Sequence, residues 1–163
     1  MPTIEKLFVN RLSELPPDGF RELMLESERA GLRLVRRLVT EWEDGSNQFA
    51  RPGEVLFAAV CDERIVGVCG LNVDPHANRE YVGRVRHLYV LSEFRGQGIG
   101  RKLVEEVIAA ARGRFRVLRL RTDNADAARL YERLGFQACD EQHCTHILDL
   151  KPPRSLVPEK RLR

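Results

Sequence analysis

The chain has 163 residues and a formal net charge of +3, with 43% hydrophobic and 31% charged residues, a composition typical of a globular domain. Residues 151–163 alone carry a net charge of +4, which leaves −1 for the rest of the chain. This distribution argues against a nucleic-acid interface. No apolar run is long enough to span a bilayer. Residues 1–10 contain no apolar core typical of a signal peptide, so we expect a cytoplasmic protein.

The amino-terminal third is predicted to form one strand and a helical region. Residues 6–12 favour a strand, which ends before Pro16-Pro17. From Asp18, a candidate helix cap, apolar residues recur at helical spacing as far as Trp42. Because glycine costs about 1 kcal/mol in a helix interior, we expect this region to break near Ala30-Gly31.

The middle of the chain reads as a hairpin followed by a strand–helix–strand unit. Residues 55–61 and 65–73 flank a short polar turn and predict an antiparallel hairpin. After a polar loop at 75–79, residues 81–91 favour a buried strand and 99–111 an amphipathic helix. Since a helix crosses over before the next strand, at 115–121, that strand should run parallel to 81–91.

The carboxyl-terminal part is predicted to contain a helix at 124–134 and a hairpin of 136–140 with 143–150. Residues 1–150 would form one domain, followed by a flexible basic tail at 151–163. No metal site is expected, because the Cys and His residues between 139 and 146 lack the paired spacing of metal ligands.

A turn rich in glycine and arginine, Arg95-Gly96-Gln97-Gly98-Ile99-Gly100, lies between the predicted strand at 81–91 and the following helix. Its glycines allow a sharp turn and a close approach of the backbone to a ligand. The first amides of the helix have no partner inside the helix and lie at the positive end of its dipole. Together these features predict a binding site for an anion such as a diphosphate, with Arg101 and Lys102 adding positive charge.

Three interpretations of this turn differ in their motif requirements. A dinucleotide-binding motif needs a third glycine where Arg101 stands, although Asp123 is near the distance of a ribose-binding acid. A nucleotide-triphosphate loop needs Gly-Lys-Ser/Thr, which Gly100-Arg101-Lys102 does not provide. A purely structural turn would leave Arg95 unexplained.

The residues best resemble the GNAT superfamily of acetyl-CoA-dependent N-acetyltransferases. The turn matches its Arg/Gln-x-x-Gly-x-Gly/Ala signature, and the strand before it contains the family-like triplet Leu88-Tyr89-Val90. A second family segment is present in order, as Asn124, Ala127, Tyr131, Gly135 and Phe136. The resemblance covers about residues 54–150 and implies a single-domain α/β (α+β) fold. Such a fold has a mixed, mostly antiparallel sheet of six to seven strands, a splayed parallel central pair and helices on both faces.

The resemblance also implies a cosubstrate site and a catalytic residue. The backbone of Leu88, Tyr89 and Val90 would pair with the pantetheine of acetyl-CoA, and Asn124 would contact it across the cleft. Tyr131 would act as general acid toward the leaving thiolate. The residues that would hold the diphosphate are those of the turn and the helix start: Arg95, Gly96, Gln97, Gly98, Ile99, Gly100 and Arg101.

The general base is left open. Many relatives place a Glu on the central strand where this chain has Arg84 and Arg86. His87 titrates near neutrality, but it should face away from Leu88 and is expected to be packed or solvated. Glu80 or a water relay are the other candidates. The two arginines could recognise an acidic substrate, although an ion-paired or solvated face is preferred.

These features favour transfer of acetyl from acetyl-CoA to a primary amine by direct attack in a ternary complex, with a small molecule as the preferred acceptor. The alternatives are acetylation of a protein or peptide, transfer of another acyl group, and a CoA-binding sensor without catalysis. We expect no nucleic-acid or membrane partner. The acceptor's identity and the oligomeric state, including a homodimer, stay open.

Overall fold

A seven-stranded β-sheet, in the order β1-β2-β3-β4-β5-β7-β6, forms the centre of the computed structural model, which describes residues 6–16 and 18–150. All neighbouring strands pair antiparallel except β4 and β5. The predicted tail at 151–163 lies outside the described residues. The elements in chain order are β1 (Leu7–Arg11), α1 (Arg21–Arg29), α2 (Leu34–Glu43), β2 (Val55–Cys61), β3 (Arg64–Val73), β4 (Val82–Val90), the 3-10 turn η1 (Ser92–Phe94), α3 (Ile99–Ala111), β5 (Val117–Leu120), α4 (Ala125–Arg133), β6 (Gln137–Glu141) and β7 (Cys144–Asp149).

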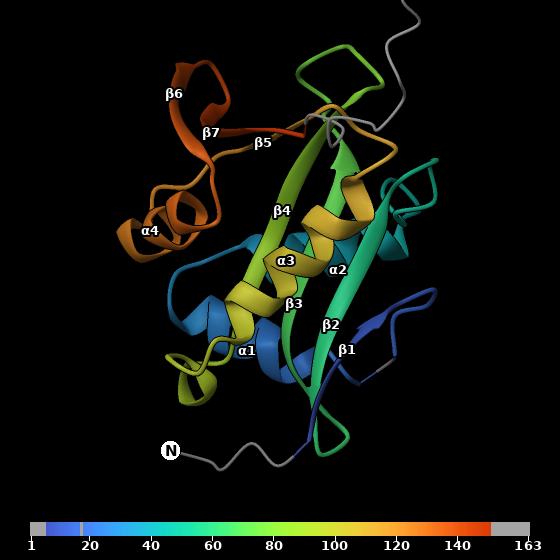
Figure 1. Ribbon diagram of the computed structural model, residues 1–163. Helices are drawn as coiled ribbons and strands as arrows, with labels where there is room; N and C mark the ends of the chain where they lie inside the picture. Colours follow the sequence, from blue (N-terminus) through green and yellow to red (C-terminus); the bar gives the residue numbers. More distant parts are fainter. Residues whose placement is uncertain (1–5, 17, 151–163) are drawn as a thin grey trace, which may run out of the picture.

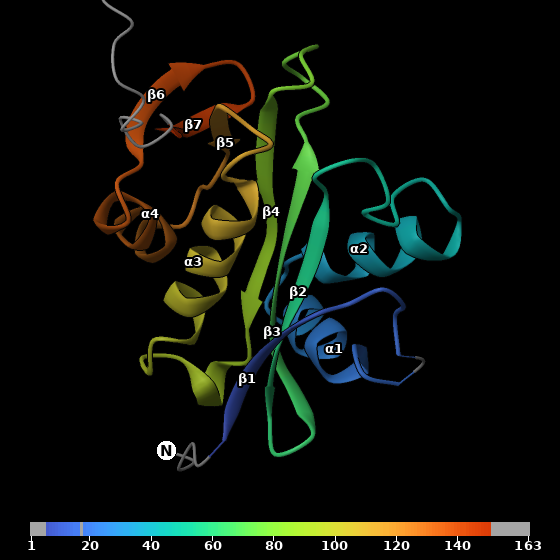
Figure 2. The same cartoon turned by 45° about the vertical axis from the view of Figure 1, so that its right-hand side comes forward.

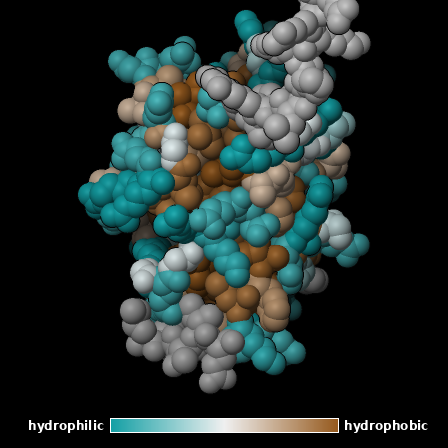
Figure 3. All heavy atoms as spheres, in the orientation of Figure 1, coloured by the Kyte–Doolittle hydropathy of each residue, from teal (hydrophilic) through white to brown (hydrophobic). Residues whose placement is uncertain are grey.

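Helices cover both faces of the sheet, as predicted. α1 and α2 pack on one face, and α3 and α4 lie on the other (Figures 1 and 2). The apolar stripe of α3 is buried against the sheet: Ile99, Leu103, Val104, Val107, Ile108 and Ala111. In the space-filling view, hydrophilic side chains cover the outer sides of α3 and α4, while apolar side chains gather beside α3 over β4 and β5 (Figure 3).

The first helical region breaks where the sequence predicted. Gly31 has φ +77°, a left-handed conformation that ends α1, and α2 begins three residues later. The expected cap by Asp18 is wrong. α1 begins at Arg21 without a side-chain cap, and Asp18 contributes only its backbone carbonyl, which accepts from Arg21 N at 3.3 Å.

The parallel central pair is short and splays apart. β4 and β5 pair only from Val82↔Val117 to Arg84↔Arg119. β4 then continues to Val90, whereas β5 ends at Leu120. The second half of β4 therefore pairs with β3 on one side and has no strand partner on the side facing β5. This is the splayed arrangement that the sequence predicted.

A β-bulge lies in this splayed half of β4. Val68 of β3 pairs with Tyr89, and Gly70 pairs with Arg86, so two residues of β4 stand opposite Cys69 alone. His87, at the bulge, has φ +60°. Its Nδ1 donates to the carbonyl of Leu34 at the start of α2, at 2.9 Å. His87 is thus packed against α2, which is one of the two alternatives expected for it.

His87→Gln is expected to flatten the pH dependence of stability between pH 7 and pH 5. Burial, helped by the nearby Arg86, lowers the pKa of His87 from its ordinary value of 6.5 to about 4. As the pH falls, the unfolded chain therefore binds a proton before the folded chain does. This difference costs the wild type about 2 kcal/mol of unfolding free energy between pH 7 and pH 5.

Urea unfolding at the two pH values measures the effect. His143→Gln is the control, because His143 is only half-buried. An equal pH dependence in wild type and His87→Gln would show that the folded protein does not resist protonation at this site.

Candidate active site

The predicted anion turn leaves the backbone open to a ligand. Gly96 and Gly98 have φ +76° and +82°, and a Cβ added at either position would meet no atom within 4 Å. Gly98 is the N-cap of α3 and has no side chain to occupy the first amides of the helix. These observations fit a bound diphosphate, which would take the donors that a capping side chain takes elsewhere.

The side chains of the turn are more engaged than the sequence suggested. Arg95 folds back onto β4, where its Nε donates to the carbonyl of Val90 at 2.9 Å and its guanidinium lies 5.3 Å from the ring centre of Tyr89. Arg101 pairs with Glu105 at 2.8 Å. Ile99 is buried, so only its backbone can contact a ligand. The turn would therefore bind an anion mainly through its amides.

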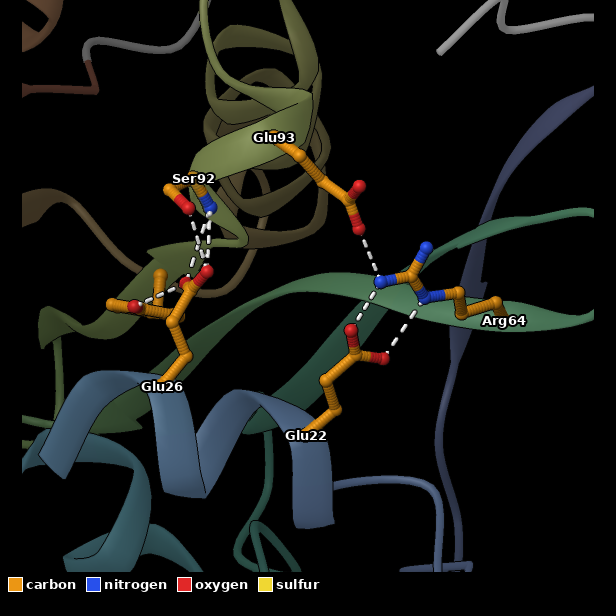
Figure 4. Close-up of polar contacts among 6 residues, drawn as sticks. Glu22, Glu26, Arg64, Ser92 and Glu93 are labelled. Carbon is orange, nitrogen blue, oxygen red and sulfur yellow. Dashed lines mark hydrogen bonds and ion pairs between the residues drawn. The ribbon is translucent and has the colours of Figure 1, made fainter. Parts of the chain in front are cut away.

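Two sets of polar contacts fasten α1 to the segment that precedes the turn (Figure 4). Glu26 accepts hydrogen bonds from the Ser92 hydroxyl at 2.7 Å and from the Tyr89 hydroxyl at 2.5 Å. Arg64 of β3 pairs with both Glu22 of α1 and Glu93 of η1. Burial alone would raise the pKa of Glu26, but the bonds from Tyr89 and Ser92 outweigh it and lower that pKa. Glu26 thus stays ionised at neutral pH. Sequence periodicity gave no signal for these contacts.

Tyr131, the predicted general acid, is buried on α4, and 5% of its surface is exposed. Its ring packs edge-on against Phe136 at 5.4 Å. Burial, with a smaller contribution from Cys69 of β3, raises the pKa of Tyr131 well above its ordinary value. The hydroxyl therefore keeps its proton at neutral pH. Cys69 also lies opposite the β4 bulge, so Tyr131 lies near the sheet at the level where β4 has no strand partner on its β5 side.

Asn124 lies at the start of α4 and has a structural role that the sequence reading missed. Its Oδ1 accepts from the amides of Asp126 at 2.9 Å and Ala127 at 3.0 Å, which makes it the N-cap of α4. α4 also approaches the turn, since a Cβ on Gly100 would lie 3.5 Å from Leu130 Cδ2. The cap thereby helps to fix α4, and with it Tyr131, beside the turn.

A pocket of about 890 Å³ opens on the opposite face of the sheet, between α2 and β4. Arg84, Arg86 and His87 of β4 line it together with Arg37 and Glu41 of α2. The sequence placed these three β4 residues on one strand but could not show that the bulge and α2 enclose them. Glu80, a candidate base, is exposed and does not line this pocket.

The two arginines of β4 differ in their partners. Arg84 is buried, donates to the carbonyl of His143 at 2.8 Å and lies 3.5 Å from the carboxylate of Asp74. Asp74, 2% exposed, also lies 3.7 Å from Arg119. The expectation of an ion-paired face is thus confirmed for Arg84. Arg86 has no ion pair within 4 Å among the residues that the structure describes.

Within residues 6–16 and 18–150, no group of three or more His, Cys, Asp or Glu side chains is placed to hold a metal ion. None of the helices in these ranges has the length and apolar character needed to cross a membrane.

Comparison with known proteins assigns the family. The model of the Acetyltransferase (GNAT) family matches residues 18–136. The chain belongs to the GNAT family. A protein from Exiguobacterium sp. 255-15 described as an acetyltransferase shares its fold, with a TM-score of 0.79, 29% identity, and coverage of 88% of this chain and 93% of that one. Escherichia coli YhbS, a GNAT N-acetyltransferase solved with CoA, superposes with a TM-score of 0.64 and 20% identity, over 92% of this chain and 84% of its own.

Relatives from curated collections differ in their acceptors. N-alpha-acetyltransferase 30 of Schizosaccharomyces pombe is 34% identical over 86 residues, which are 51% of this chain and 57% of that protein. Aminoglycoside N(6')-acetyltransferase type 1 of Klebsiella aerogenes is 39% identical over 72 residues, 42% of this chain and 47% of its own. The chain thus spans about half the length of these two GNAT relatives.

Proposed function

We propose that this GNAT protein is a cytoplasmic N-acetyltransferase that moves an acetyl group from acetyl-CoA to the primary amine of a small molecule. One observation carries the proposal: the uncapped, open start of α3 lies beside the buried Tyr131 and beside the half of β4 that has no strand partner on its β5 side. The proposed site contains a place for the diphosphate, a strand edge for the pantetheine and a proton donor for the thiolate.

The proposed cosubstrate contacts are those expected from the sequence. The amides from Gln97 to Arg101 bind the diphosphate, and the free backbone edge of Leu88–Val90 pairs with the pantetheine amides. Asn124 keeps its Nδ2 for a contact from the far side, since its Oδ1 caps α4. The Val90 carbonyl already accepts from Arg95, so its remaining lone pair is the one available to the pantetheine.

The reaction then proceeds in two steps: the amine adds to the acetyl carbon, and the thiolate of CoA leaves. The amine nitrogen bonds to the acetyl carbon while a backbone N–H near Val90 stabilises the carbonyl oxygen as it gains charge. The carbon–sulfur bond breaks, and Tyr131 gives its hydroxyl proton to the sulfur. His87 does not suit the role of base, because its Nε2 is buried and its pKa is lowered to about 4. In this proposal the amine proton leaves to water and water returns a proton to the Tyr131 phenolate, so that the net products are the amide and the free thiol of CoA.

The pocket on the α2 face supports a small acceptor. Its volume of about 890 Å³ lies within the range of small-molecule sites. Two of the relatives above mark the alternatives by their names, one an N-alpha-acetyltransferase and the other an aminoglycoside acetyltransferase.

Acetyl-CoA is expected to raise the melting temperature, whereas NADH is not. A ligand at 100 times its Kd adds about 2.7 kcal/mol to the unfolding free energy, or about 5 to 10 °C for a chain of this size. Thermal unfolding with each compound measures this effect, and release of free CoA thiol with a panel of amines measures transfer. No shift with acetyl-CoA would contradict the proposal. A shift without thiol release for any amine would favour a CoA-binding sensor.

A further inference from the structure

Positive charge is concentrated in the pocket between α2 and β4. Five arginines and two glutamates line it: Arg33, Arg37, Arg51, Arg84, Arg86, Glu41 and Glu54. Both glutamates accept hydrogen bonds from surrounding residues, although Glu41 Oε2 is buried and has no hydrogen-bond partner among the described residues. Glu54 accepts from Asn72 at 2.9 Å and from the amide of Arg51 at 3.0 Å, and Glu41 accepts from Arg37 at 3.0 Å. The acids of the pocket therefore do not neutralise its arginines one for one.

Arg86 is the arginine of β4 that lacks a fixed anion. Arg84, two residues earlier, has Asp74 and a backbone carbonyl as partners, whereas no described carboxylate comes within 4 Å of Arg86. Burial lowers the pKa of Arg86, and the more distant Glu41 offsets part of that effect. Arginine nevertheless stays charged at neutral pH. A partly buried guanidinium without a partner favours an incoming oxyanion, which it can bind with two hydrogen bonds.

Arg86 also lies at the level of the proposed chemistry. It pairs with Gly70 of β3, the residue next to Cys69, and Cys69 neighbours Tyr131 on the other face. The last β4–β5 pair, at Arg84, ends two residues before it. A molecule bound to Arg86 in the pocket would thus have its amine beside the opening between β4 and β5.

We propose that the acceptor is an amine that also carries a carboxylate, and that Arg86 binds this carboxylate in the pocket between α2 and β4. This inference rests on the proposed acetyl transfer, and it makes Arg86 a residue that determines acceptor specificity.

Matched acids and amides test the inference. Thiol release is measured at saturating acetyl-CoA with glycine, β-alanine, 4-aminobutyrate and 6-aminohexanoate, each beside its carboxamide. The series varies the distance between amine and carboxylate, and each pair differs only in charge. We expect the best acid to exceed its amide at least 10-fold in kcat/KM.

Arg86→Gln is expected to lower kcat/KM for that acid by about 100-fold, mainly through KM, because a partly buried charge pair loses one partner. The same variant should change kcat/KM for the matching amide less than twofold. Arg36→Gln is the control, since Arg36 is exposed on α2, pairs with Glu28 and does not line the pocket. The shift in melting temperature with acetyl-CoA checks that each variant is folded.

The outcomes separate the two proposals. Amides that react as well as the acids, or an Arg86→Gln variant that loses both alike, would overturn the role of Arg86 and leave acetyl transfer standing. Absence of thiol release with every acid and amide, despite binding of acetyl-CoA, would overturn the inference; absence of release with the wider panel of amines as well would overturn the proposed function.

Discussion

Gly98→Glu is expected to abolish the stabilisation of the protein by acetyl-CoA. Gly98 adopts a left-handed conformation at the N-cap of α3, and the space beside it is open. A glutamate there strains the backbone and brings a carboxylate to the donors that would hold the diphosphate. Thermal unfolding should therefore lose the whole shift, about 5 to 10 °C at 100 times the wild-type Kd.

Gly113→Glu provides a matched control for this variant. Gly113 has φ +85°, no atom lies within 4 Å of an added Cβ, and it follows the other end of α3. The same residue type in the same conformation should lower the melting temperature of the free protein while leaving the acetyl-CoA shift intact. A full shift in Gly98→Glu would show that the diphosphate does not bind at this turn.

Tyr131→Phe is expected to slow turnover by about 100-fold or more, the usual contribution of a positioned general acid. The substitution removes only the hydroxyl, and the ring still packs against Phe136. Cofactor binding should be nearly unchanged, because the diphosphate site lies in the turn and not on α4. Steady-state thiol release gives the rate, and thermal unfolding with acetyl-CoA reports binding.

The control for this experiment is Tyr81→Phe, which removes the hydroxyl of an exposed tyrosine at the start of the β4 region. We expect that variant to turn over at the wild-type rate. Equal rates for Tyr131→Phe and the wild type would make Tyr131 a packing residue, and the thiolate would then take its proton from water.

Local patterns predicted the elements because each depends on residues close in sequence. The helical stripe from Ile99 to Ala111, the break at Gly31 and the glycine turn all follow from spacing or from backbone conformation. The parallel pairing of β4 and β5 followed from the helix between them. The failed prediction of an Asp18 cap is local too: the helix begins three residues later, at Arg21.

The site was harder to predict because it depends on contacts between distant segments. Nothing near Arg84 or Arg86 in the sequence distinguishes the two arginines. In the fold, Arg84 contacts the carboxylate of Asp74 and the carbonyl of His143, whereas Arg86 has no fixed anion among the described residues. The bulge at His87 is a shift in register between β3 and β4, and no glycine in β4 marks that point in the sequence. Asn124 matched a family motif, but its hydrogen bonds to the next amides show that it also caps α4.

The contacts of α1 with Ser92 and Glu93 affect how much conformational freedom the turn loses when it binds the cosubstrate. A loop already fastened at its leading edge loses little conformational freedom when it receives a ligand, so more of the contact energy remains as affinity. The two halves of this fastening should respond differently to ionic strength. The exposed Glu22–Arg64–Glu93 triad weakens as salt screens it. The hydrogen bonds that Glu26 accepts from the neutral hydroxyls of Tyr89 and Ser92 are less sensitive to salt, because they do not join two opposite charges. Preorganisation of the loop should therefore survive in concentrated salt.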